Sequence, residues 1–206
     1  IDNFYTATVY EKGAELCRMI KTILGPGNFR QGSDLYFARH DGEAATVENF
    51  VRAMEDASGE DLAQFRRWYC DAGTPSLRVK EKFDSAGAYA LTLSQSTKPT
   101  PGQSDKPPRD IPVSFALVGS RSGDILDQGL IRLQDAETTK KFGPYRERPI
   151  ASLLRGYSAP ATIDQALSLD DRLSIAKAEP DLFSRWSATE ALWRDLSLAF
   201  AGAIEM

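Results

Sequence analysis

Residues 74–97 read TPSLRVKEKFDSAGAYALTLSQST, and they mark the point where the hydrophobic pattern of the chain changes. Before them, apolar residues recur every three or four positions, as they do in amphipathic helices. From Thr74 onward apolar and polar residues alternate, which is the pattern of half-buried β-strands. Residues 84–87 separate two such runs and predict the turn that joins the two strands. The sequence therefore predicts a β-domain that begins near residue 75.

Further alternating runs extend this β-domain. They lie at residues 111–117, 125–133, 137–142 and 150–154. Short strands at this spacing are typical of a small antiparallel sandwich, which we expect over residues 76–159. The intervening stretch 98–112 holds five prolines, so it cannot be helical, and its residues 98–109 are predicted to form an exposed loop.

Helical patterns flank the β-domain on both sides. Four short helices are expected before it: from Tyr10 to a stop at Gly25-Pro26, from a cap at Asn28 to His40, from a cap at Thr46 to Gly59, and over residues 62–73. After Leu167 the helical period returns, with a break at Pro180. We expect an α+β chain in three parts: residues 1–74, 75–160 and 161–206.

Composition excludes several classes of protein and of site. The 206 residues carry a net charge of −4, which argues against nucleic acid as a partner. There is no apolar run long enough to span a membrane, and the first residues do not resemble a signal peptide. Two cysteines, Cys17 and Cys70, are expected as buried free thiols in a reducing, cytoplasmic setting. One histidine and no ligand motif predict that this chain holds no metal.

Few residues suggest chemistry by their pattern alone. Tyr10-Glu11-Lys12-Gly13 opens a helix, where a tyrosine is most often a half-buried aromatic between solvated neighbours. His40 at a helix end is explained by its favourable interaction with the helix C-terminus. The carboxylates at 55, 56, 60 and 61 flank a turn, where they are expected to cap and solubilise helices. Residues 66–69, RRWY, favour packing over nucleic-acid contact.

Four stretches carry a resemblance to a known family. They are NFYTATVYEKGAELCRMIKTILG from Asn3, YFARHDGEAAT from Tyr36, FVRAMEDASGEDLAQFRRWYCDAGTP from Phe50 and DLFSRWSATEAL from Asp181. In this order they resemble the bacterial aminopeptidase N family, zinc metallo-aminopeptidases of the gluzincin group. The resemblance implies an internal fragment with three parts: the helical end of a thermolysin-like catalytic domain, an antiparallel β-sandwich and the start of an all-helical domain.

The resemblance also implies an activity. Members of this family remove single residues from the N-terminus of peptides, and their zinc is held by HExxH and a later glutamate. This chain contains neither motif, so zinc belongs to the full-length enzyme and the fragment alone is expected to be inactive. Tyr10, in the motif YEKG, matches the tyrosine that donates a hydrogen bond to the tetrahedral intermediate. Tyr5 matches a residue that lines the pocket for the first side chain of the substrate.

Two other functions remain open at this point. The chain could belong to a non-catalytic scaffold or peptide-binding module that keeps the aminopeptidase architecture, because fold does not determine function. It could also be an independent helix-sandwich-helix adaptor. For the enzyme, the expected partners are peptides. For the fragment, we also expect self-association through apolar helix faces left uncovered.

Overall fold

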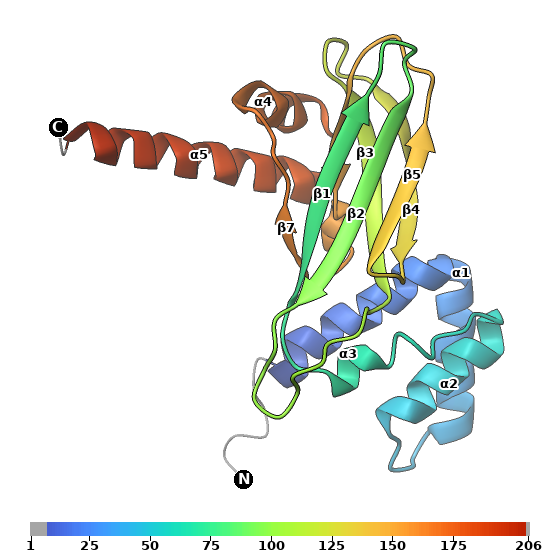
Figure 1. Ribbon diagram of the computed structural model, residues 1–206. Helices are drawn as coiled ribbons and strands as arrows, with labels where there is room; N and C mark the ends of the chain where they lie inside the picture. The colour runs from blue at the N-terminus through green and yellow to red at the C-terminus, as the bar shows by residue number, and fades with distance from the viewer. Residues whose placement is uncertain (1–7, 205–206) are drawn as a thin grey trace.

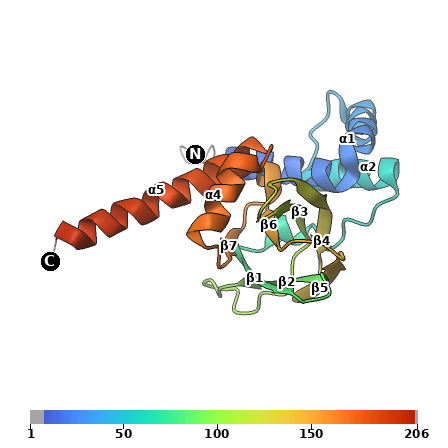
Figure 2. The same ribbon diagram turned by 90° about the horizontal axis from the view of Figure 1, so that it is seen from above.

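The computed structural model describes residues 8–204 and divides them into helices, a β-sandwich and further helices (Figure 1). The first helical group lies across one end of the sandwich, and the last group lies along its side (Figures 1 and 2). The helical elements are η1 (Thr8–Lys12), α1 (Gly13–His40), α2 (Val47–Ser58), α3 (Arg67–Cys70), η2 (Arg155–Tyr157), α4 (Leu169–Ala178) and α5 (Leu182–Ile204). Across the described residues, none of these helices is long and apolar enough to cross a membrane.

Helix α1 combines the first two expected helices into one kinked element. Gly25 has φ 76° and ψ 163°, outside the helical region, and Pro26 follows it. The first helix was expected to end here and a second one to begin after it, but the structure has one helix with a kink at this point. Beyond the kink, α1 packs on α2 so closely that a methyl group added at Gly32 would lie 2.5 Å from the Met54 sulfur. That contact keeps the second half of α1 in place.

The prediction of the third helix is confirmed, and the prediction of the fourth helix is mostly wrong. Thr46 caps α2 in a capping box with Asn49, and Gly59 ends it with φ 74°. Over residues 62–73 only the single helical turn α3 forms. The backbone N–H of Leu62 donates instead to the Glu55 side chain at 2.9 Å, and the Arg67 N–H reaches back three residues to Gln64. These tight turns place Leu62, Phe65 and Trp68 in the core.

The β-sandwich has two sheets, as expected. Their strands are β1 (Pro75–Phe83), β2 (Tyr89–Thr97), β3 (Ile111–Gly119), β4 (Ile125–Leu133), β5 (Glu137–Phe142), β6 (Pro149–Leu153) and β7 (Thr162–Asp164). One sheet has the order β5-β2-β1-β7 and the other β4-β3-β6. All pairs are antiparallel except β1 with β7, which pair in parallel from Ser76 opposite Thr162. Strand β7 was not predicted, and it lies beyond residue 159, where the sandwich was expected to end.

Strand β3 is the best covered strand of the sandwich. Eight of its nine residues are buried. Although large apolar residues alternate with other residues along β3, neither face of the strand is exposed to solvent. One face meets the opposite sheet, and the other lies against α1, α4 and η2. The main core runs without a break from the helices into both sheets, through residues such as Leu16, Ile20, Leu77, Leu91, Val113, Leu117 and Leu133.

The proline-rich loop is exposed except at its end. Residues 98–108 are exposed or partly exposed, whereas Arg109 and Asp110 are buried. The prediction of an exposed loop over residues 98–109 is therefore wrong at Arg109. The guanidinium can be buried because backbone carbonyl oxygens accept its hydrogen bonds.

Helix α5 projects away from the rest of the molecule (Figures 1 and 2). The break before it is confirmed, because α4 ends at Ala178 and Pro180 precedes α5. Large apolar side chains along α5 are exposed, among them Trp186, Trp193, Leu196, Leu198 and Phe200. The expected uncovered apolar face is therefore present on this helix.

Self-association of the isolated chain is expected to depend on this face, because burying it removes apolar area from water. Trp193 is 65% exposed, and Trp193→Glu should shift the chain towards monomer in sedimentation experiments over a concentration series. Ser104→Glu adds the same charge at an exposed residue of the proline-rich loop, away from α5, and serves as the control. A parent chain that is monomeric at every concentration would contradict the prediction.

Candidate functional site

Tyr10 lies in a short π-helical turn at the start of the helical part. The turn η1 leads directly into α1, and the Tyr10 side chain is 60% exposed. The sequence predicted a helix that begins at Tyr10, but not a π-helix. Single π-turns joined to α-helices are rare and occur often at functional sites. The predicted role of Tyr10 stays a prediction, and Tyr5 lies outside the described residues.

The helix behind Tyr10 is anchored in the core. Leu16, Met19 and Ile20 have exposed fractions of 2% or less, and Ile23 is partly buried against the same core. These residues occupy one face of α1, as the helical spacing predicts. The start of the helix is therefore held to the body of the molecule while Tyr10 faces outward.

A cleft of about 490 Å³ opens beside η1. Glu11, Lys12 and Glu15 line it from the helix, Trp68, Gly73 and Thr74 from the segment before β1, and Tyr157 and Pro160 from the turn after β6. Burial lowers the pKa of Lys12, and the neighbouring Arg109 guanidinium lowers it further, whereas Asp71 opposes the shift. The cleft therefore brings residues from three distant parts of the sequence next to Tyr10.

Arg109 fixes the wall of this cleft. Its side chain donates to the carbonyl oxygens of Gly73 at 2.9 Å, Asp71 at 3.0 Å and Ala72 at 2.8 Å. Its guanidinium lies 5.0 Å from the ring centroid of Trp68, close enough for a cation–π contact. Burial lowers the pKa of Arg109. The buried Arg109 thus fixes residues 71–73 between α3 and β1, and Gln103 and Lys106 bind the same connection from the proline-rich loop.

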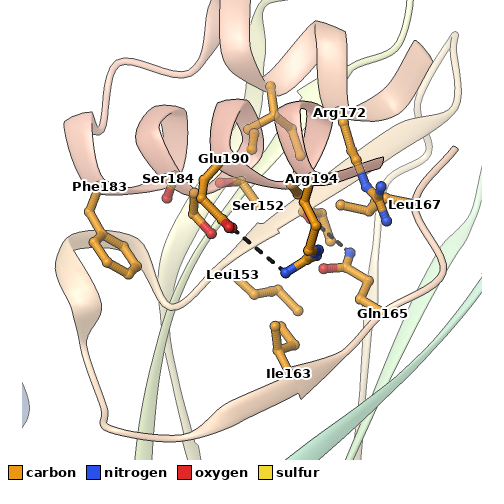
Figure 3. Close-up of a pocket in the computed structure, with 15 residues that line it drawn as sticks. Ser152, Leu153, Ile163, Gln165, Leu167, Arg172, Phe183, Ser184, Glu190 and Arg194 are labelled. Atoms are coloured by element: carbon orange, nitrogen blue, oxygen red, sulfur yellow. Dashed lines mark hydrogen bonds and ion pairs between the residues drawn. The ribbon is translucent and has the colours of Figure 1, made fainter. Parts of the chain in front are cut away.

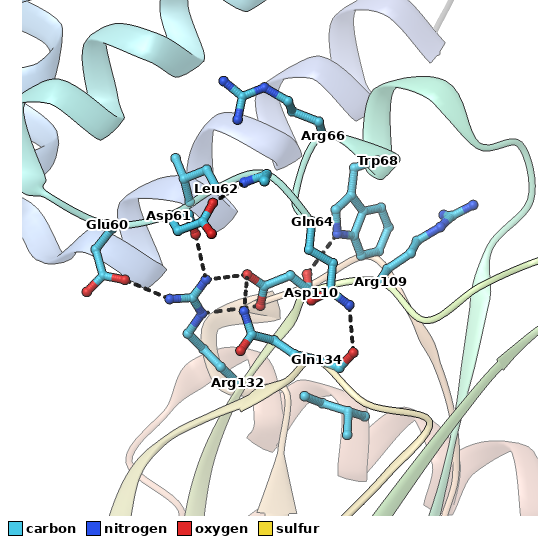
Figure 4. A network of polar contacts seen from close by, with 12 residues as sticks. Glu60, Asp61, Leu62, Gln64, Arg66, Trp68, Arg109, Asp110, Arg132 and Gln134 are labelled. Carbon is cyan, nitrogen blue, oxygen red and sulfur yellow. Dashed lines mark hydrogen bonds and ion pairs between the residues drawn. The ribbon is translucent and has the colours of Figure 1, made fainter.

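A second polar network lies next to Arg109 and joins the helices to the sandwich (Figure 4). The indole N–H of Trp68 donates to the Asp110 carbonyl oxygen at 2.8 Å. The buried Asp110 carboxylate pairs with Arg132, which also binds Glu60 at 2.8 Å. Gln64 reaches across to the Gln134 carbonyl oxygen at 2.6 Å. These contacts hold the two parts of the chain together and leave no carboxylate pair free for acid–base chemistry within the network.

The other sequence candidates also have structural roles. Arg66 bridges Glu48 and Glu55, and its hydrogen bond holds the pKa of Glu48 at about 2. The Asp61 side chain accepts from the Ala63 N–H at 2.7 Å. The expectation that these carboxylates cap backbone N–H groups is confirmed for Glu55 and Asp61, whereas the ion pair of Glu60 with Arg132 was not predicted. His40, at the end of α1, lies 3.4 Å from Glu43.

The cysteines are free thiols, as expected, but they are not both buried. Cys17 is partly buried, which raises its pKa, and Cys70 is exposed at the end of α3. Cys70 is exposed because the expected fourth helix is only one turn long. Within residues 8–204, no three histidine, cysteine or acidic side chains are grouped so as to hold a metal ion.

A second hollow lies between the sandwich and the last two helices (Figure 3). Leu153 and Ile163 border it from β6 and β7, and Phe183, Glu190 and Arg194 border it from α5. Glu190 and Arg194 lie 3.8 Å apart, and the Gln165 amide donates to the Ala151 carbonyl oxygen at 2.9 Å. These two polar contacts therefore lie within α5 and within the sandwich part, and they do not join one to the other.

Two families match successive parts of the chain. Residues 1–69 match the peptidase family M1 domain, and residues 73–166 match a domain of unknown function, DUF3458, with an Ig-like fold. The class of the protein follows from this order and from the fold. The chain contains the helical end of an M1 peptidase domain joined to an Ig-like β-sandwich.

Individual relatives define the family more closely. Aminopeptidase N of Escherichia coli K12 is 42% identical over 93% of the chain, and that of Caulobacter vibrioides is 48% identical over 98%. The crystal structure of Legionella pneumophila aminopeptidase A in complex with aspartic acid superimposes with a TM-score of 0.85, at 30% identity over 96% of the chain and 22% of that structure. The chain is homologous to bacterial aminopeptidase N, which confirms the resemblance, and it spans 23% of the length of these two relatives.

The sequence pattern did not reveal Tyr157, which lines the cleft, or Arg109, which binds the Gly73 carbonyl beside it. Arg109 directly follows two prolines, Pro107 and Pro108, in a polar segment, a context that indicates exposure. Tyr157 follows a glycine in a short loop, where nothing in the pattern points to a site 147 positions earlier at Tyr10. Both residues reach the cleft only through the packing of the sandwich on α1.

Removal of the Arg109 side chain is expected to destabilise the chain strongly. Arg109→Met removes the Arg109 hydrogen bonds to the Asp71 and Gly73 carbonyl oxygens and leaves the Ala72 carbonyl with Lys106 alone, at a cost of about 2–4 kcal/mol in the free energy of unfolding. Urea unfolding at low protein concentration, followed by tryptophan fluorescence, measures the change. Arg78→Met is the control: its side chain is 70% exposed, and its loss should cost at most about 0.5 kcal/mol. A loss at Arg109 as small as that at Arg78 would show that the carbonyls find other donors.

Proposed function

We propose that the full-length protein to which this chain belongs is a zinc aminopeptidase that removes single residues from the N-terminus of peptides. The observation that carries the proposal is the similarity, at 42% and 48% identity over 93% and 98% of the chain, to proteins named aminopeptidase N. The match over 98% of the chain includes the π-turn with Tyr10, helix α1 and the sandwich. Peptides with a free N-terminus are then the expected partners.

We assign Tyr10 the role of hydrogen-bond donor to the reacting carbonyl. When water adds to a peptide carbonyl, negative charge develops on its oxygen, and a fixed donor stabilises that charge more in the transition state than in the substrate. The anchored start of α1 supports this role, because a donor on a rigid element needs little reorganisation during the reaction. The exposed position of Tyr10 leaves it accessible to a substrate.

Zinc belongs to the proposal for the full-length enzyme and not for the residues described here. The described residues contain no group that fits a metal site, so no step of this proposal passes through a metal in this chain. The resemblance implies that the ligands lie elsewhere in the full-length protein. We also propose a cytoplasmic location, supported by the two free cysteines.

The chain by itself is expected to bind no stoichiometric zinc and to hydrolyse no aminoacyl anilide. The reason is the lack of a ligand motif in its sequence. Metal analysis after mild chelation and a chromogenic aminopeptidase assay check both parts. Retention of nearly one equivalent of zinc, or turnover above a heat-denatured blank, would refute this expectation.

Tyr10→Phe in the full-length enzyme is expected to lower kcat on the order of a hundredfold to a thousandfold, as for other oxyanion donors. KM and zinc content should change little, because the ring is kept and the substrate carbonyl needs the bond less than the transition state does. Steady-state kinetics measures the effect. Tyr36→Phe, on the same helix but in a ring cluster with Phe37 and Phe50, is the control and should leave kcat unchanged.

The same measurement separates the enzyme from the alternatives. A kcat within about threefold of the parent would remove Tyr10 from the mechanism. A full-length protein without any aminopeptidase activity would favour the scaffold or peptide-binding module. That outcome would leave the fold assignment intact, because the homology concerns architecture as well as chemistry.

A further inference from the structure

The turn after β6 holds a strained backbone. Leu154, Gly156 and Tyr157 have φ values of 57°, 61° and 54°, all in the left-handed region. Glycine adopts this region easily, but for a leucine or a tyrosine it costs about 1–2 kcal/mol per residue. Such a conformation persists only where the surrounding structure imposes it. The contacts of residues 154–157 show what does so.

One set of contacts ties this turn to the last helices. Arg155 donates to the buried Glu179 carboxylate through Nε at 3.1 Å and Nη2 at 2.9 Å. The Gly156 N–H donates to Asp181 at 3.0 Å, and the same carboxylate accepts from the Ser184 N–H at 2.8 Å in the first turn of α5. The turn is therefore fixed to the connection between α4 and α5.

The other set of contacts ties the turn to α1 through a single arginine. Arg18 Nη1 donates to the Gly156 carbonyl oxygen at 3.1 Å, and its guanidinium lies 5.4 Å from the ring centroid of Tyr157. The same guanidinium pairs with Glu15, one helical turn nearer to Tyr10. Phe183 packs against the Tyr157 ring with a centroid distance of 5.2 Å. Arg18 thus joins α1 to a turn that is itself held by the sandwich and by α5.

These contacts bear on Tyr10 because α1 continues from η1 without a break. Arg18 lies about two helical turns from Tyr10. Tyr157 also lines the cleft beside η1 together with Lys12 and Glu15. Burial of the apolar anchors Leu16 and Ile20 is not directional, so it does not by itself determine how the helix is rotated or shifted along its axis. The Arg18 guanidinium donates to one carbonyl and stacks on one ring, and these directional contacts determine both.

We propose that Arg18 is a positioning residue for Tyr10: by binding the strained turn at Gly156 and Tyr157, it sets the orientation of the helix start that presents the Tyr10 hydroxyl to the substrate. The inference rests on the proposed function of Tyr10 and adds a second residue to it. A displacement of about 1 Å in a catalytic group can cost on the order of a hundredfold in rate. The loss of Arg18 should therefore be visible in kcat.

The test is a double-mutant cycle in the full-length zinc enzyme with Arg18→Met and Tyr10→Phe. Arg18→Met keeps the apolar stem and removes the guanidinium, and it should lower kcat on the order of tenfold to a hundredfold while KM changes by less than about threefold. In the Tyr10→Phe background the same substitution should change kcat by less than about twofold, because the hydroxyl to be positioned is already absent. A purely structural defect would lower kcat by the same factor in both backgrounds.

Arg30→Met is the matched control, since Arg30 lies on α1 and pairs with Asp34 at the surface, where its side chain is 78% exposed. It should leave kcat unchanged. Zinc content and circular dichroism verify that each variant is folded. If Arg18→Met does not fold, Arg18→Lys enters the same cycle with the same expected coupling, because lysine keeps the charge but loses the planar fork.

The outcomes are distinct. Coupling between Arg18 and Tyr10 supports the inference. Additive effects, or a normal kcat for the Arg18 variant, overturn the inference and leave the role of Tyr10 standing if Tyr10→Phe alone is impaired. A normal kcat for Tyr10→Phe overturns the proposed role of Tyr10 and the inference with it.

Discussion

The guanidinium of Arg109 donates to the carbonyl oxygens of three successive residues, and the junction between the helices and the sandwich depends on it. A buried charge costs free energy unless its hydrogen-bonding groups are filled, and here the backbone fills them without a carboxylate. The bonds fix residues 71–73 just before β1, while the ring of Trp68 covers the guanidinium. Beside it, Arg132 of β4 joins the sandwich to Glu60 of the helical part. The Arg109 bonds also fix Gly73, which lines the cleft next to η1.

The sequence pattern predicted those helices and strands whose limits are determined by residues within or directly beside them. The change of period at Thr74 located the sandwich, and Thr46 and Gly59 located the ends of α2. In place of the fourth helix, the N–H groups of residues 67–69 donate three residues back, and Arg66 and Trp68 bind Glu55 and Asp110 from outside the segment. The break at Gly25 became a kink because α2 holds the far half of α1. In both cases a contact from outside the segment decided the outcome.

The candidate site was less predictable than the fold. Tyr10 was found through its motif, since a tyrosine beside a glutamate and a lysine has no chemical meaning by spacing alone. The π-turn around it is five residues long, too short for a distinct hydrophobic period. Leu154 and Tyr157 adopt a backbone conformation that their residue types avoid, so the sequence argues against what the tertiary contacts impose. Arg18 and Arg109 acquire their roles only when distant segments meet.

Strand β7 has a consequence for the behaviour of this sheet in a crowded solution. An exposed strand edge offers unpaired backbone groups on which another chain can add a strand. The three residues of β7 occupy part of the β1 edge, and their shortness leaves little for a foreign strand to follow. The opposite edge strand, β5, carries Lys140 and Lys141, whose charges disfavour the addition of another strand along this edge. Both edges of the four-stranded sheet are therefore protected against intermolecular β-pairing. Such pairing is a route to aggregation that exposed edges of apolar strands favour.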